Sequence, residues 1–213
     1  MSTTIENNLW QNPSVYITEV QLAHLLGDSA DSRHAHIRRA VQKGRLVRIK
    51  RGLYYLGERL TSNRPHPFEI AQLIYGPSYV SLEAALSHHG LIPEAVYTIT
   101  SVTIKRQRSF KTSLGLFVYH TLPTDNFFTG VSYVQEGGHI FLLASPWKAL
   151  LDYIYCYKKK WKGLEPLAES LRIDPEDLPK ISKTELEQFK HFYQRENINY
   201  FVNSLPKECI DEY

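Results

Sequence analysis

The chain has 213 residues, of which 43% are hydrophobic and 22% are charged, a balance typical of a globular protein with one or two domains. It contains no apolar run near 18 residues and no signal-peptide pattern, so the sequence predicts no membrane-spanning helix and favours a cytoplasmic protein. Cys156 and Cys209 have neither a metal-binding nor a redox spacing, which excludes a disulfide framework.

The first predicted elements follow a polar segment. Residues 1–13 show no hydrophobic period, so we expect a flexible arm or an extra short helix there. Thr18 is a good N-cap for a first helix, and Gly27 is expected to end that helix because glycine adopts the left-handed conformation at least cost. The residues expected on one face of this helix are Val20, Ala23 and either His24 or Leu25.

A second helix and a β-hairpin come next. The second helix is predicted to open at Ser32 and to bury Ile37, Ala40 and Val41. Residues 46–50 and 53–56 are predicted to form two strands, with Arg51-Gly52 turning the chain between them. Two helices followed by a hairpin are the order of a winged helix-turn-helix, in which the second helix enters the major groove of DNA.

The charge of this segment agrees with DNA binding. Residues 13–56 hold eight basic and three acidic residues, whereas the whole chain has a net charge of only +3. The positive charge is therefore concentrated where a phosphate backbone would lie. The alternative is an amphipathic helix pair with a solvated basic face. The predicted DNA-binding residues are Ser32, Arg33, His36, Arg38, Arg39, Lys43, Arg45, Arg48, Lys50 and Arg51.

Composition changes after the hairpin. Residues 57–67 combine charges with Asn63, Pro65 and Pro67, which suits a linker, so we predict two domains, residues 1–60 and 61–213. In the second, helices are predicted from Phe68 and from a cap at Ser81, and strands over residues 96–104, 114–122, 131–134 and 139–143. The buried stripe of a later helix is predicted to be Trp147, Leu150, Leu151 and Ile154, with Asp152 off this stripe. The predicted fold is α+β: a winged helix-turn-helix followed by a domain with a small mixed sheet and several helices.

Other residues could carry chemistry. His88-His89 is a candidate metal or acid–base pair, but adjacent helical side chains point about 100° apart, which favours a packing role. The basic loop over residues 105–111 could contact nucleic acid, although a solvated hairpin tip is the simpler interpretation. A hydrolase using Asp152 with His120 or His139 is a further alternative. Because the chain has none of the common catalytic motifs, we predict no enzyme activity, no cofactor and no metal.

Three stretches resemble a known family: KRGLYYL at the end of the hairpin, YVSLEAALSHHGL and LLASPWKALLDYIY. Their order is similar to that of the AbiEi family of transcriptional regulators, the antitoxins of type IV toxin–antitoxin systems, over residues 16–155. The resemblance implies an N-terminal domain that binds double-stranded promoter DNA and represses its own operon, and a C-terminal domain needed for antitoxin activity. It also implies a nucleotidyltransferase-like toxin as the genetic partner, which such antitoxins counteract without needing to bind it. The alternative is a DNA-binding regulator whose C-terminal domain senses an unrelated ligand or protein partner.

Overall fold

The computed structural model describes residues 14–26, 29–58, 61, 64–93, 96–123 and 125–211. The expected arm over residues 1–13, the predicted helix stop at Gly27 and part of the predicted linker lie outside these residues. The described residues form a mixture of helices and β-sheets, as expected for an α+β chain. None of the helices in the described ranges has both the length and the apolar character needed to cross a membrane.

The N-terminal part contains a three-stranded sheet and two helices. In chain order its elements are β1 (Tyr16–Thr18), α2 (Glu19–Leu26), α3 (Ala30–Gln42), β2 (Leu46–Lys50) and β3 (Leu53–Leu56). The strand order is β1-β3-β2, and both pairings are antiparallel. Strand β1 was not expected from the sequence, where Thr18 is simply the cap of a helix; in the structure it pairs with β3, with Tyr16 opposite Tyr55.

A six-stranded mixed sheet forms the centre of the molecule. Its strands are β4 (Ser78–Val80), β5 (Thr98–Thr103), β6 (Arg108–Thr112), β7 (Gly115–Thr121), β8 (Val131–Glu136) and β9 (His139–Ala144). They lie in the order β6-β7-β5-β4-β9-β8, with β5 parallel to β7 and β4 parallel to β9. The sheet is therefore mixed as predicted, but larger than expected.

Two of these strands correct the sequence prediction. Residues 108–112, predicted as part of a basic loop, form the edge strand β6 because they pair with β7 and place Phe110 against the rings of Tyr75 and Tyr119. Residues 78–80 were expected only to precede a helix. They form β4, which is buried between β5 and β9.

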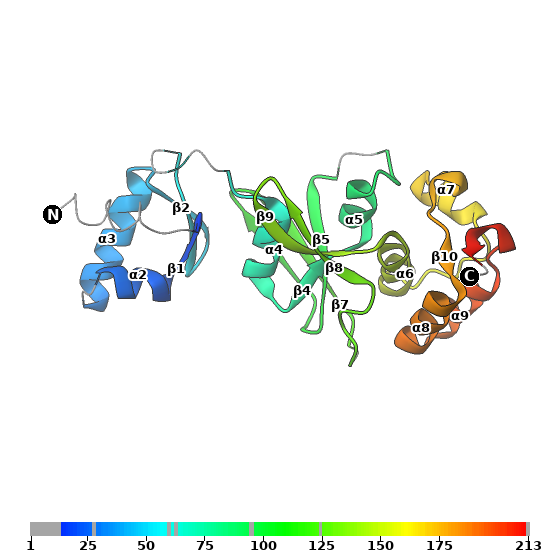
Figure 1. Ribbon diagram of the computed structural model, residues 1–213. Helices are drawn as coiled ribbons and strands as arrows, with labels where there is room; N and C mark the ends of the chain where they lie inside the picture. The colour runs from blue at the N-terminus through cyan, green and yellow to red at the C-terminus, as the bar shows by residue number, and fades with distance from the viewer. Residues whose placement is uncertain are drawn as a thin grey trace.

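Helices cover both faces of the central sheet. They are α4 (Pro67–Tyr75), α5 (Leu82–His88) and α6 (Pro146–Cys156). Figure 1 shows α4 on the side that faces the N-terminal part, and α5 and α6 on the opposite side. The predicted stripe of α6 is buried in full, and Ser145 caps this helix by accepting a hydrogen bond from the backbone N–H of Lys148 (3.3 Å).

The C-terminal residues add a helical layer. It consists of α7 (Glu165–Leu171), η1 (Pro175–Asp177), α8 (Lys183–Tyr193), α9 (Glu196–Asn203) and η2 (Lys207–Cys209), with the short parallel pair β10 (Ile181–Ser182) and β11 (Ile210–Asp211). Ser182 caps α8 by accepting a hydrogen bond from the N–H of Glu185 (3.1 Å). In Figure 1 these helices lie at the opposite end of the molecule from α3.

The N-terminal sheet is buried on both faces. One face packs under α2 and α3 in a small cluster that includes Ile17, Leu46 and Tyr54. Tyr16, Ile49 and Leu53 belong instead to the large core of the central sheet and its helices. Two hydrogen bonds support this contact, from the backbone N–H of His66 to the hydroxyl of Tyr16 (3.0 Å) and from Ser113 Oγ to the carbonyl of Arg48 (3.4 Å). The two parts of the chain therefore share apolar packing across the predicted domain boundary.

Candidate nucleic-acid interface

Side-chain caps fix where α2 and α3 begin. Thr18 Oγ1 accepts a hydrogen bond from the N–H of Gln21 (3.2 Å), and Gln21 Oε1 accepts one from the N–H of Thr18 (2.8 Å). This reciprocal pair is a capping box and confirms Thr18 as the N-cap. The second helix begins two residues before its predicted opening, because Ser29 Oγ accepts a hydrogen bond from the N–H of Ser32 (3.4 Å) and Ala30 starts the first turn.

The buried faces of these helices are only partly as predicted. In α3, Ile37 and Ala40 are buried and Val41 packs against the same cluster, as expected. In α2 the predicted face is wrong at Val20, which is 68% exposed, and it omits Leu22, which is the buried residue. Leu25, one of the two alternatives for that face, packs against the small cluster as expected. Apolar spacing alone does not show which side of α2 is buried. The choice depends on where the N-terminal sheet lies, since Leu22 packs with Ile17 and Leu46 of that sheet.

The surface of α3 that faces away from the small cluster is cationic. Arg38, Arg39 and Gln42 are exposed, with the small side chain of Ala35 between them. The guanidinium Nε of Arg39 donates a hydrogen bond to the carbonyl of Ala35 (3.2 Å), which holds its aliphatic stem along the helix. Lys43 is exposed at the end of the helix. This surface can offer planar donor groups and an amide to an anionic, hydrogen-bonding partner.

Glu19 connects α2, α3 and the β2–β3 hairpin. Its carboxylate Oε1 lies 3.1 Å from Nε2 of His34 on α3. Its backbone N–H donates to the carbonyl of Gly52 in the hairpin turn (3.0 Å). Gly52 has a φ of +80°, a left-handed conformation that favours glycine at this turn. Helices and hairpin are therefore held in a fixed arrangement.

The ten predicted DNA-binding residues have different environments. The exposed ones are Arg38, Arg39, Lys43, Arg48 and Arg51, and the half-buried ones are Ser32, Arg33, His36, Arg45 and Lys50. Among these, the ammonium group of Lys50 donates to the carbonyl of Ile74 at the end of α4 and lies 5.9 Å from the ring centre of Phe110. Burial, followed by the charges of Lys105 and Arg108, lowers the pKa of Lys50. Lys50 therefore lies at the contact with the central sheet, a position that the local sequence pattern does not predict.

Among the described residues, no hydrogen bond or ion pair joins the alternative hydrolase residue Asp152 to His120 or His139, although the charge of Asp152 acts on His120. Asp152 was expected off the buried stripe of α6, but its side chain is fully buried. Its two oxygens accept hydrogen bonds from four groups: the hydroxyls of Tyr79 (3.0 Å), Ser81 (2.6 Å) and Tyr193 (2.7 Å) and the ammonium of Lys148 (2.5 Å). His139 instead pairs through Nδ1 with the carboxylate of Glu69 (2.7 Å). Ser81 precedes α5 as predicted, but its hydroxyl bonds to Asp152 and makes no side-chain cap.

His88 and His89 have different surroundings. His89 Nε2 lies 2.8 Å from the carbonyl of Ala144, whereas the ring of His88 packs against Phe68 and Phe141. The two rings thus have separate packing roles, as predicted. Within the described residues no group of three or more His, Cys, Asp or Glu side chains has the arrangement that a metal ion needs.

In a comparison with known protein families, the N-terminal part of the chain has a match. Residues 15–57 match the family described as transcriptional regulator, AbiEi antitoxin. The match begins one residue before β1 and ends one residue after β3, so it covers the two helices and the three strands described above. It includes the first of the three stretches on which the resemblance was based; the other two lie outside it. No curated protein matches the chain.

Proposed function

We propose that the chain is a DNA-binding transcriptional repressor in which residues 15–57 form a winged helix-turn-helix. In this proposal α3 is the recognition helix and the β2–β3 hairpin is the wing. The observation that carries it is the exposed face of α3, where Arg38, Arg39 and Gln42 surround Ala35, within the segment that matches a family of transcriptional regulators. Arginine and glutamine side chains are those that most often read guanine and adenine edges in the major groove.

We infer, further, that the protein is the antitoxin of a type IV toxin–antitoxin system. It would repress its own operon from a promoter operator in the cytoplasm and counteract a nucleotidyltransferase-like toxin encoded beside it. Support comes from the family description, which names an AbiEi antitoxin. Residues 61–213 would provide the antitoxin activity, because α3 and the hairpin supply the DNA contacts. We propose no catalytic step for this chain.

The repressor proposal is tested by footprinting the purified protein on the DNA upstream of its own gene. Protection of a discrete promoter site is expected, and it should be lost in the double variant Arg38→Ala/Arg39→Ala. Lys162→Gln is the matched control, since Lys162 is an exposed cation of the C-terminal part and should leave the footprint unchanged. A uniform pattern of weak protection along the fragment would argue against an operator.

The antitoxin proposal needs a separate experiment. Co-expression with the neighbouring reading frame should rescue growth if that frame encodes the toxin, and the Arg38→Ala/Arg39→Ala variant should still rescue when it is expressed from an unrelated promoter. Failure of the wild-type chain to rescue would contradict the antitoxin role while leaving DNA binding intact. A ligand-sensing regulator is the second candidate, and a cavity in the C-terminal part favours it.

A further inference from the structure

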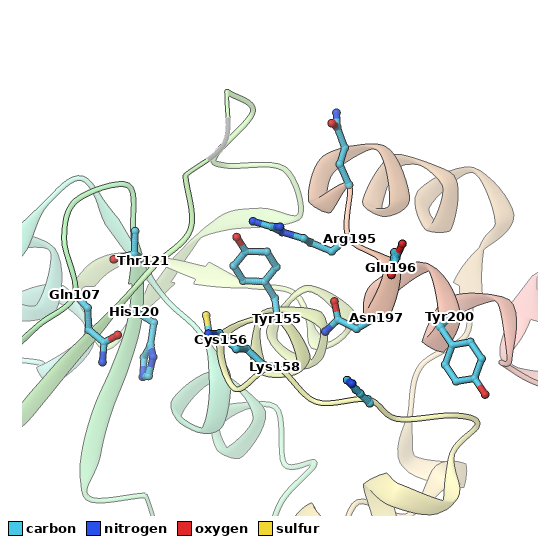
Figure 2. A pocket seen from close by; sticks show the side chains of 12 residues that line it. Gln107, His120, Thr121, Tyr155, Cys156, Lys158, Arg195, Glu196, Asn197 and Tyr200 are labelled. Carbon is cyan, nitrogen blue, oxygen red and sulfur yellow. The ribbon is translucent and has the colours of Figure 1, made fainter.

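A cavity of about 1150 Å³ opens in the C-terminal part of the molecule. It lies between the end of strand β7, the C-terminal end of α6 and the N-terminal end of α9 (Figure 2). In Figure 1 these elements lie away from α3, so the cavity is separate from the proposed DNA-binding surface. Its volume is large enough to enclose most of a nucleotide-sized molecule.

The right-hand wall in Figure 2 is fixed by hydrogen bonds. The side-chain amide of Asn197, in the first turn of α9, donates to the carbonyls of Lys159 (3.0 Å) and Ile154 (3.4 Å), which joins α9 to the end of α6. Tyr155 lies between the ring of Tyr193, with centroids 5.7 Å apart, and the guanidinium of Arg195, which is 5.7 Å from the Tyr155 ring centre. The lining is thus positioned by the fold itself, which lowers the entropic cost of binding a ligand.

Positive charge exceeds negative charge in this lining. Lys158, Lys160 and Arg195 are exposed cations of the cavity, and Glu196 is its one carboxylate. None of the three cations forms an ion pair with a residue that the structure describes. Lysines at the end of α6 could merely offset the helix dipole. However, Lys159, which lies over the rings of Tyr153 and Trp161 at 5.7 and 5.6 Å, already supplies a cation there.

His120 adds a buried polar atom to the opposite wall. Its side chain is on β7, only 8% of the residue is exposed, and no described residue is hydrogen-bonded to its Nε2. The ring packs edge-on against Tyr157, with centroids 5.2 Å apart. Buried polar side chains nearly always have a hydrogen-bond partner, so Nε2 of His120 is available to form a hydrogen bond with a ligand in the cavity.

We propose that this cavity binds a nucleoside phosphate. The phosphate groups would lie against Lys158, Lys160 and Arg195, whose net charge with Glu196 is suited to a ligand with about two negative charges. The base would stack on the ring of Tyr200, which lines the cavity and is 54% exposed. A simple inorganic anion would leave this aromatic ring unused, and an apolar ligand would leave the cations unpaired. This site goes beyond the proposed function, because DNA binding through α3 does not require it.

Calorimetric titration of the full-length protein with ATP and GTP tests the proposal. At least one nucleotide should bind, and adenosine, guanosine and pyrophosphate should each bind at least about tenfold more weakly, because each lacks one half of the recognised structure. Lys158→Gly/Lys160→Gln and Arg195→Gln should each weaken nucleotide binding by about tenfold. Glycine is chosen because Lys158 has a φ of +52°, so this substitution removes the cation without straining the backbone.

Two controls place the binding in the cavity. Lys162→Gln removes a nearby exposed cation outside the lining, and Arg39→Ala removes one from the proposed DNA-binding helix; both should bind the nucleotide as the wild type does. All variants replace exposed side chains, so their thermal midpoints should match that of the wild type. The proposal is overturned if neither nucleotide binds at millimolar concentration, if pyrophosphate binds as tightly as the nucleotide, or if the cavity variants bind it normally.

Discussion

Lys148 and Asp152 are two charged residues of α6 whose side chains are completely buried. Taking such a pair out of water is costly unless further hydrogen bonds satisfy it. Here Tyr79, Ser81 and Tyr193 provide hydroxyl donors to the carboxylate, and Lys148 also donates to the hydroxyl of Tyr193 (3.0 Å). Burial raises the pKa of both tyrosines, so the hydroxyls keep their protons. The network joins β4, α6 and α8 at one point.

Asp152→Asn is expected to destabilise the protein by about 3–5 kcal/mol, because it leaves the ammonium of Lys148 buried without a counter-charge. Chemical denaturation of the full-length chain measures this free energy of unfolding. The control Asp177→Asn changes an exposed carboxylate and should alter it by less than about 0.5 kcal/mol. Equal, small effects for the two substitutions would show that Lys148 and Asp152 are not buried as an ion pair of charged groups.

One buried histidine and two half-buried histidines predict a loss of stability in mild acid. Burial lowers the pKa of His66, His89 and His120 in the folded protein below the ordinary value near 6.5. The unfolded chain therefore binds more protons than the folded chain as the pH falls through that value, and stability falls with it. The free energy of unfolding should be lower at pH 5.5 than at pH 7.5. His89→Gln should reduce this difference, whereas His191→Gln, at an exposed position, should not; a steeper dependence in His89→Gln would contradict the assignment.

At the scale of elements, α6 is the most deeply buried helix of the C-terminal part. Leu151 is completely buried beside Trp147 and Leu150. Leu151→Ala should cost roughly 2–5 kcal/mol, because it removes buried methyl groups and leaves a cavity. Urea denaturation gives this value directly. If Leu150→Ala and Leu151→Ala both leave the unfolding midpoint unchanged, the packing of α6 described here is wrong.

The elements that the sequence predicted well have strong local signals. The helix α3, the Arg51-Gly52 turn and the cap at Thr18 depend on apolar spacing, a glycine and a hydroxyl within a few residues of one another. Strands β1, β4 and β6 have no such signal. They are three to five residues long, and each is formed through pairing with a strand that is distant in sequence or, for β6, with a neighbour beyond a short turn. These strands form because of their pairing with other strands, which the hydrophobic period of the sequence does not encode.

The candidate site was predictable to a similar extent. Exposed cations on α3, such as Arg38 and Arg39, follow from the positions of Ile37 and Ala40, which fix the buried side of the helix. The environment of Lys50 does not follow in this way, because Ile74 and Phe110 reach it from the central sheet and its helices. The cavity residues were missed for the same reason, since His120 and Arg195 are 75 positions apart in the chain.

At the scale of the whole molecule, the N-terminal sheet is packed between its own helices and the central core. Tyr16, Ile49 and Leu53 contribute to the larger core, so separating the two parts would expose apolar surface. A flexible tether between independent domains would leave that face of the sheet polar. We therefore expect the two parts to differ in function while depending on each other for stability.

A fragment ending at Leu60 should still bind operator DNA, because α3 and its supporting cluster are intact, but it should unfold at a lower temperature than the full chain. A fragment starting at Pro67 should retain any antitoxin effect. DNA-binding titrations and thermal denaturation of both fragments check this division. Operator binding by the C-terminal fragment alone, as strong as that of the full chain, would contradict it.

The central claim is that α3 reads bases while the hairpin contacts phosphates, and titration of operator and random DNA at several salt concentrations tests it most directly. Arg39→Ala should weaken operator binding by about 1–3 kcal/mol and random-DNA binding much less, because base contacts discriminate between sequences. Arg51→Ala should weaken both equally and lower the salt slope by about one, because a phosphate contact releases counterions whatever the sequence. If every substitution on α3, Arg38→Ala included, weakens both DNAs equally, α3 does not read bases. If none of these substitutions affects DNA binding, the winged helix-turn-helix proposal is wrong.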